Sequence, residues 1–239
     1  MNNLSDIESF IDKRINIFFE EILNLIRNLT LSDILININP YLVFIKSSLI
    51  VGELIKNSIN HFLLSQEETI FGNFMEDLAI FVCNKVYGAK KSELTGIDLE
   101  FERDGIIYIV EIKAGWNWGN SSQIKQMKIN FNNAKNLLEK QTGKQVIAVN
   151  GCCFGKLRKI DKGAYLKLCG QRFWELISGN EQLYIDIIEP IGHKAREKNE
   201  EFINEYSRIL NIFTLEFSKE FCDDGFINWE KLLQFNSGK

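Results

Sequence analysis

Residues 97–113 read Ile97-Asp98-Leu99-Glu100-Phe101-Glu102-Arg103-Asp104-Gly105-Ile106-Ile107-Tyr108-Ile109-Val110-Glu111-Ile112-Lys113. The first five residues alternate apolar and charged side chains, which is the period of a half-buried β-strand. Residues 103–105 supply the residue types of a tight turn, and residues 106–113 are rich in β-branched side chains. This stretch therefore predicts a two-stranded antiparallel hairpin.

Helical patterns lie on both sides of this hairpin. Before it, apolar residues at helical spacing predict helices over residues 7–29, over residues 43–64 and from Ser65 or Glu67 to Val86, with a short connector ending at Pro40. After it, we expect a helix from a cap at Ser121 or Ser122 to Glu139, followed by a strand over residues 145–149. A helix around residues 173–177 and a strand over residues 184–188 come next. A charged helix over residues 194–221 is the last element that we expect. The order predicts an α/β fold in which a mixed β-sheet is flanked by helices, with long N- and C-terminal helical extensions.

The chain of 239 residues reads as one domain. No internal repeat and no stretch rich in Pro, Gly or Ser separates its parts. We divide residues 1–239 into a helical extension (1–64), a core (65–190) and a C-terminal helical arm (191–239).

Composition excludes several classes of protein. Hydrophobic residues make up 45% and charged residues 25%, which is typical of a soluble folded chain. No apolar stretch approaches the roughly 18 residues that a membrane-spanning helix needs, and the first ten residues lack a signal-peptide pattern. We therefore expect a cytoplasmic protein that does not enter a membrane.

The five cysteines are expected to be reduced thiols. Cys152, Cys153 and Cys169 lack the Cys-x₂₋₄-Cys spacing of a zinc site, and no matching pair of histidines is present. Buried thiols are the prediction for these positions.

The net charge of −4 conceals a basic segment. Between Lys113 and Arg172 the chain has ten Lys and two Arg against two acidic residues, so this segment is +10 and the rest of the chain is −14. A local excess of cations attracts polyanions whatever the total charge, which favours a double-stranded DNA partner. The alternative is a solvated face whose charges pair with acids elsewhere.

The predicted hairpin places charges that suit metal-assisted hydrolysis. Glu111 and Lys113 are two residues apart, so their side chains share one face of the strand, while Asp98 on the neighbouring strand reaches the same end of the sheet. Two carboxylates and the backbone carbonyl of Ile112 are ligands that Mg²⁺ favours, and Lys113 can orient or help to deprotonate an attacking water. Glu76, on the preceding helix, is a further candidate, against the alternative of a surface glutamate.

The loop after the second strand offers uncharged polar groups suited to base edges and phosphates. Its alternative is that Trp116 or Trp118 is ordinary core packing. The predicted DNA-binding residues are Asn117, Trp118, Asn120, Ser121, Ser122, Gln123, Lys125, Lys156 and Arg158.

Residues 96–101 together with Glu111-Ile112-Lys113 resemble the PD-(D/E)xK nuclease motif, with Ile97 in place of the usual proline. Residues 68–76, 115–123 and 170–174 are similar to type II restriction endonucleases that cut short GC-rich palindromes with degenerate or unspecified internal positions. The resemblance extends from the first helix to Pro190. It implies a restriction-endonuclease-like fold with Asp98, Glu111 and Lys113 as the catalytic triad. It also implies a Mg²⁺-dependent homodimer in which each subunit cuts one DNA strand.

We therefore expect a type II restriction endonuclease that hydrolyses both strands of a palindromic DNA site. Two-fold symmetry of the DNA site is the physical reason to expect a dimer. A repair or junction-resolving nuclease of the same fold is one alternative. A catalytically silent DNA-binding module is another.

Overall fold

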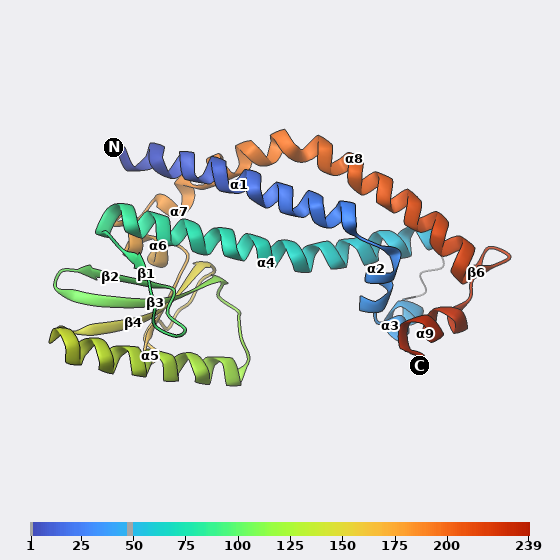
Figure 1. The fold of residues 1–239 in the computed structure, drawn as a ribbon. Coiled ribbons are helices and arrows are strands. Elements are labelled where there is room, and N and C mark those ends of the chain that lie inside the picture. The colour runs from blue at the N-terminus through green and yellow to red at the C-terminus, as the bar shows by residue number, and fades with distance from the viewer. Residues whose placement is uncertain (1, 47–49) are drawn as a thin grey trace. The chain divides into compact units, whose positions relative to one another are not determined.

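A computed structural model describes residues 2–46 and 50–239, with the side chains of residues 2–4 and 194–199 excepted. The helices are α1 (Asn2–Asn28), α2 (Leu31–Asn37), α3 (Pro40–Ile45), α4 (Val51–Tyr87), α5 (Ser121–Thr142), α6 (Gln171–Ser178), α7 (Leu183–Asp186), α8 (Ile188–Phe221) and α9 (Trp229–Ser237). The strands are β1 (Lys90–Lys91), β2 (Leu99–Arg103), β3 (Ile106–Gly115), β4 (Val146–Phe154), β5 (Leu166–Cys169), β6 (Cys222–Asp223) and β7 (Phe226–Ile227). The predicted α/β class, with a mixed sheet and terminal helices, is confirmed (Figure 1). No helix in these described ranges is long and apolar enough to cross a membrane.

The chain forms two compact units, each assembled from separate segments. The first unit, which we call the sheet unit, contains Met1–Ile15 and Phe71–His193. The second, which we call the helical unit, contains Asn16–Ile70 and Lys194–Lys239. The single domain divided at residues 64 and 190 stays a prediction.

The sheet unit is built on five strands in the order β1-β2-β3-β4-β5. Strands β1, β2 and β3 pair antiparallel, whereas β3, β4 and β5 pair parallel, so the sheet is mixed. The hairpin predicted from residues 97–113 is β2 and β3, with Leu99 opposite Val110. Asp104 and Gly105 both have positive φ (55° and 77°), as a tight two-residue turn between strands requires.

Helices cover the two faces of this sheet. On one face, Met127 and Phe131 of α5 pack with Ile109 and Ala148 of the sheet. On the other face, the ring of Tyr87 in α4 stacks on Phe101 of β2. Figure 1 shows α4 and α5 on opposite sides of the strands. The sheet is therefore the middle layer of the unit, and only its ends and loops are open to a ligand.

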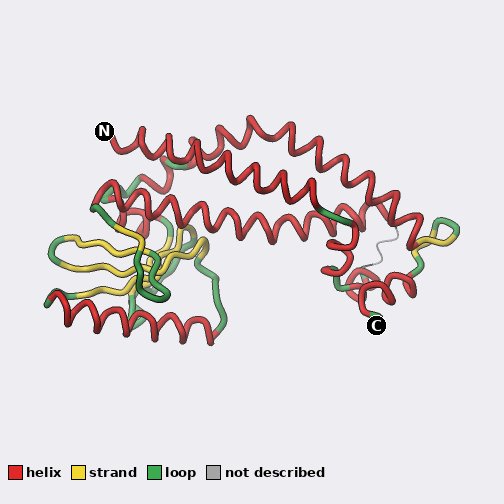
Figure 2. The backbone as a smooth tube through the Cα atoms, in the orientation of Figure 1, coloured by secondary structure: helices red, strands yellow, loops and turns green. Residues whose placement is uncertain are grey.

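The helical unit has a separate apolar core. This core joins buried residues of α1, α2, α4, α8 and α9, among them Ile26, Leu35, Ile55, Phe217 and Leu232. Apart from the short β6–β7 hairpin, its described elements are helices (Figure 2).

Several local expectations differ from the structure. The connector expected to end at Pro40 contains α2 (Leu31–Asn37), and Pro40 is the first residue of α3. The helix expected over residues 43–64 is divided: residues 43–45 belong to α3, residues 47–49 are outside the described residues, and residues 51–64 belong to α4. The helix expected over residues 65–86 is the continuation of α4, because no proline or glycine near Ser65 interrupts it. The strand expected over residues 184–188 is wrong: Leu183 and Ile187 are the buried positions there, which is helical spacing, and Pro190 is tolerated in the first turn of α8. The expected cap at Ser121 or Ser122 is instead Asn120.

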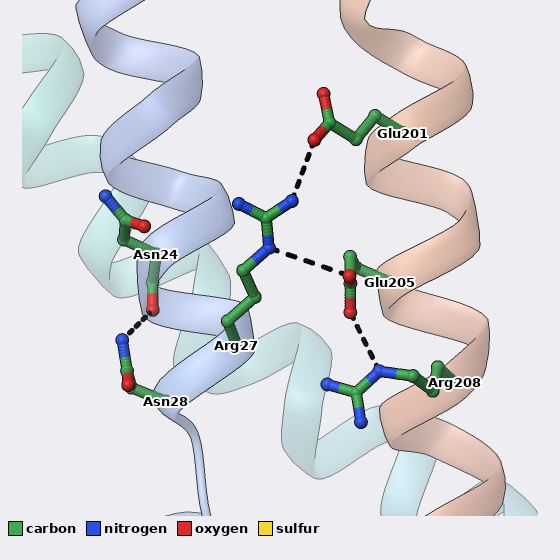
Figure 3. A network of polar contacts seen from close by, with 6 residues as sticks. All are labelled: Asn24, Arg27, Asn28, Glu201, Glu205 and Arg208. Atoms are coloured by element: carbon green, nitrogen blue, oxygen red, sulfur yellow. Dashed lines mark hydrogen bonds and ion pairs between the residues drawn. The ribbon is translucent and has the colours of Figure 1, made fainter.

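Within the helical unit, Arg27 of α1 joins a charged network with α8 (Figure 3). Its Nη2 lies 2.7 Å from Oε1 of Glu201 and its Nε lies 3.6 Å from Oε1 of Glu205. Arg208 donates from Nε to Oε2 of Glu205 at 2.8 Å. The network is exposed, whereas the neighbouring Ile26 is fully buried.

These two neighbours provide a paired test of what stabilises the helical unit. Ile26→Ala should lower the free energy of unfolding by about 2–5 kcal/mol, because it removes buried apolar atoms and leaves a cavity. Arg27→Ala should leave the unfolding midpoint almost unchanged, because exposed ion pairs are screened by solvent. Urea denaturation of both variants measures the difference, and equal losses would contradict this account of the core.

Gly151 allows β4 to approach α6 closely. A Cβ added at Gly151 would lie 2.3 Å from Cε2 of the Phe173 ring, which is fully buried. Gly151→Ala should therefore lower the unfolding midpoint. Gly192→Ala is the matched control, because a Cβ at Gly192 meets nothing within 4 Å and alanine favours a helix by about 1 kcal/mol. If the Gly151→Ala variant is as stable as the control, β4 can move away from Phe173 without a loss of free energy of unfolding, which would contradict this prediction.

Candidate active site

Asp98, Glu111 and Lys113 meet at one end of the β2–β3 hairpin. Leu99, the first residue of β2, pairs with Val110 of β3, and Asp98 directly precedes this pair while Glu111 directly follows it. Burial is the larger cause of the raised pKa of Glu111, and the Asp98 carboxylate is close enough for its charge to raise that pKa as well. Lys113 Nζ lies 2.9 Å from Oε1 of Glu111, so these two side chains share one face of β3, as their spacing predicts. Ile112 between them is buried toward the other face.

The Asp98 carboxylate continues the ladder where the β2–β3 backbone pairing ends. The backbone N–H of Asp98 donates to the carbonyl of Val110 at 2.9 Å, and the N–H of Ile112 then donates to Oδ2 of Asp98 at 2.6 Å. The N–H and C=O of one strand residue point to the same side of the strand. The carbonyl of Ile112 is therefore on the side of Asp98.

Glu111 is a partly desolvated acid with one oxygen unused. Its Oε1 contacts Lys113, while its buried Oε2 has no hydrogen-bond partner among the described residues. Burial raises the pKa of Glu111 and the nearby Asp98 carboxylate raises it further, whereas the Lys113 ammonium lowers it. A buried polar atom without a partner is costly, so this oxygen is suited to a ligand that supplies positive charge.

Lys113 is held from two sides. In addition to Glu111, its Nζ lies 5.0 Å from the centroid of the Trp118 ring, within the range of a cation–π contact. A second ammonium, that of Lys167 on β5, lies 5.9 Å from the same ring and donates to the backbone carbonyl of Trp116 at 2.7 Å. The site therefore combines two carboxylates with two lysines around one indole.

Glu76 reaches the edge strand β1 from α4. It lies on α4, which packs against the opposite face of the sheet: the backbone carbonyl of its neighbour Met75 lies 4.0 Å from Sγ of Cys153. Its own Oε1 lies 3.5 Å from Nζ of Lys91 on β1. In the described ranges, no group of three or more His, Cys, Asp or Glu side chains could hold a metal ion. The role expected for Glu76 stays a prediction.

Part of the predicted DNA-binding loop forms the N-terminal cap of α5. Asn120 Oδ1 accepts from the backbone N–H groups of Ser122 and Gln123, both at 3.1 Å. Gln123 Oε1 accepts in return from the N–H of Asn120 at 2.9 Å. Asn117 and Ser121 are exposed on the same segment. The helix cap uses these carbonyl oxygens and leaves the amide NH₂ groups of Asn120 and Gln123 as donors.

The three predicted basic contacts are exposed and lie on two segments. Lys125 is on the first turns of α5, while Lys156 and Arg158 follow β4. Lys156 also lines a recess of about 620 Å³ whose other lining residues include Phe71, Arg172 and Tyr184. Asp98, Glu111 and Lys113 are not part of that lining.

Two residues of the site were not predicted from the sequence. Asn150 is fully buried on β4 opposite Glu111, and Lys167 pairs with Asn150 from β5. Asn150 stands out in the sequence as a polar residue within the apolar stretch 146–154, which is a signal that could have identified it. Lys167 has no comparable signal, because β5 is only four residues long.

The cysteines beside the site are buried thiols, as expected. Cys83, Cys152, Cys153 and Cys169 are buried and free. Burial raises the pKa of Cys153 to about 12 and raises the pKa of Cys152 as well. A thiol with a raised pKa is a poor nucleophile near neutral pH.

Comparison with known proteins identifies the family of this chain. A family model described as type II restriction endonuclease EcoO109I matches residues 5–199. That range includes the whole β2–β3 hairpin, the loop after it and helices α5 and α6. A search among curated proteins finds no match. The chain therefore belongs to the EcoO109I family of type II restriction endonucleases.

Proposed function

We propose that this chain is a Mg²⁺-dependent nuclease of the PD-(D/E)xK group that cuts both strands of a specific palindromic double-stranded DNA site. The observation that most supports the proposal is the meeting of Asp98, Glu111 and Lys113 at one end of the hairpin, with Oε2 of Glu111 buried and unpaired. Oxygen ligands of this kind suit Mg²⁺, which takes one or two carboxylates and keeps several waters.

Asp98, Glu111 and the carbonyl of Ile112 would hold the cation. When bound, Mg²⁺ supplies charge neutralisation at a phosphate oxygen and lowers the pKa of a water molecule. Asp98 is held in place by the N–H of Ile112, and this fixes one carboxylate relative to the other. Lys113, held at Oε1 of Glu111, directs its remaining N–H donors to the attacking water or to a non-bridging phosphate oxygen.

The DNA would be bound by the loop after β3 and by the basic segment. The groups proposed to contact DNA are the exposed side chains of Asn117 and Ser121, the amide donors of Asn120 and Gln123, and Ser122, all of which follow β3 directly in the chain. Lys125, Lys156 and Arg158 would neutralise phosphates. A short GC-rich palindrome with degenerate internal positions is the expected target, from the resemblance of residues 115–123 and 170–174.

A homodimer would place one such site on each strand, because a palindromic duplex has two-fold symmetry. Size-exclusion chromatography with light scattering tests this part directly.

Plasmid digestion tests the proposed function. Purified protein with plasmid DNA and Mg²⁺ should give discrete fragments, and sequencing their ends gives the recognition site and the stagger of the cut. Nicking confined to junction substrates would instead identify a junction-resolving nuclease. Retarded but uncut DNA would identify a silent DNA-binding module.

Removal of the lysine should abolish cleavage while DNA binding remains. Lys113→Ala is expected to reduce the cleavage rate by at least about 100-fold, because a positioned proton donor or charge is lost from the site. Lys85→Ala is the matched control, since Lys85 makes an exposed ion pair with Asp6 in the same unit. Unchanged cleavage by Lys113→Ala would refute the assignment of this residue.

Cation binding can be measured without cleavage, by the unfolding midpoint. Mg²⁺ at about 100 times its Kd stabilises a protein by about 2.7 kcal/mol, so the midpoint of the wild-type protein should rise on titration. Asp98→Asn should remove most of this rise, because it removes one charge while keeping an acceptor for the N–H of Ile112. Asp104→Asn, in the exposed turn of the same hairpin, should leave the rise intact. Equal responses of both variants would place the cation elsewhere.

A further inference from the structure

Asn150 connects the loop after β3 to the strand that contains Glu111 and Lys113. Its side chain is fully buried and uses both of its ends. Oδ1 accepts from Nε1 of Trp118 at 3.0 Å, and Nδ2 donates to the backbone carbonyl of Glu111 at 3.2 Å. A buried amide satisfied on both sides fixes the orientation of its partners. Asn150 therefore sets the position of the Trp118 ring relative to β3.

The ring held by Asn150 is the one that contacts Lys113. Lysine has a long flexible side chain, so a single ion pair confines its ammonium only loosely. In this protein the Lys113 Nζ has the Glu111 carboxylate at 2.9 Å and the Trp118 ring centroid at 5.0 Å. The face of an indole attracts a cation without offering a proton acceptor, so it holds the ammonium and leaves its N–H groups available.

The two supports of Lys113 are not equivalent once a cation is present. A cation at the free Oε2 of Glu111 shares the charge of that carboxylate with Lys113 and weakens the attraction between Oε1 and the ammonium. The contact with the Trp118 ring uses neither the Glu111 nor the Asp98 carboxylate, because the ring is tied through Asn150 to the backbone of β3. Trp118 is then the support of Lys113 that remains during the reaction.

We propose that Trp118 and Asn150 are positioning residues for Lys113, and that Trp118 acts on bond cleavage rather than on the reading of bases. This inference rests on the proposed nuclease function and gives Trp118 a role other than the DNA contact expected from the sequence. Its half-buried position and its internally bonded N–H support the inference, because an indole N–H paired with Asn150 is not available to a base edge.

Three variants test the proposal. Trp118→Leu removes the ring and its N–H, Trp118→Phe keeps an aromatic face without the N–H, and Asn150→Leu keeps the buried volume without either hydrogen bond. Trp229→Phe in α9 is the matched control, because it makes the same chemical change in the helical unit, where Trp229 packs on the ring of Phe44. For each variant we would measure the single-turnover cleavage rate with Mg²⁺ at saturating enzyme, the Kd for a duplex bearing the mapped site without divalent cation, and the unfolding midpoint.

The expected result is a loss of rate without a loss of binding. Trp118→Leu and Asn150→Leu should slow cleavage by about 10- to 100-fold, as is usual for residues that orient a group at a metal-dependent centre. Trp118→Phe should lose less than Trp118→Leu, and the Kd should stay at the wild-type value for all three variants. The double variant Trp118→Phe/Asn150→Leu should be no slower than the slower of its two single changes, because both changes remove the same hydrogen bond.

Other patterns would overturn the inference. A weaker Kd or relaxed sequence preference with an unchanged rate at saturation would make Trp118 a base contact. Parallel losses of rate, binding and unfolding midpoint would make the pair a structural element only. If Lys113→Ala is inactive and Trp118→Leu is fully active, only this inference fails; if Lys113→Ala is fully active, the proposed function fails first.

Discussion

The hydrogen bond from the backbone N–H of Ile112 to the carboxylate of Asp98 is the contact on which the site depends. It occurs where the β2–β3 ladder ends, so a side chain takes the place of the next backbone carbonyl. This substitution fixes Asp98 against a central strand, and the same strand places Glu111 and Lys113 on one face by its alternation. Burial raises the pKa of Glu111, and the nearby Asp98 carboxylate raises it further. The sheet behind them is covered by helices on both faces, so the charges remain in a fixed environment.

Much of this arrangement could be predicted from residues 97–113. Alternation and a turn sequence specify the hairpin, and spacing by two specifies that Glu111 and Lys113 share a face. The neighbour of a strand in a parallel pair is not specified locally, because a crossover separates the two strands in sequence. Asn150 and Lys167 reach the site through the parallel pairing of β3, β4 and β5, and for that reason local patterns did not assign them a role. The same limit applies to Glu76, whose helix could be predicted but whose side of the sheet could not.

Errors in local structure also have physical causes. Residues 184–188 contain β-branched side chains next to a proline and were expected to form a strand, yet the buried positions Leu183 and Ile187 are four apart and fit a helix. The Ser121–Ser122 pair offers two hydroxyl groups for a cap, but the amide of Asn120 with Gln123 three residues later satisfies N–H groups reciprocally. The helical turn observed at residues 183–187 buries Leu183 and Ile187, and the cap observed at Asn120 satisfies backbone N–H groups.

The burial of the cysteines has a consequence for experiments on folding. Cys83, Cys152, Cys153 and Cys169 all lie in the sheet unit and are buried, so we expect them to react slowly with an alkylating reagent while the sheet is closed. Cys222 lies in the helical unit and is only partly buried. Modification of the first four thiols would require transient opening of the strands, whereas Cys222 reports on the other unit. The rates at which the native cysteines are alkylated therefore report on the local opening of each unit separately, without an introduced probe.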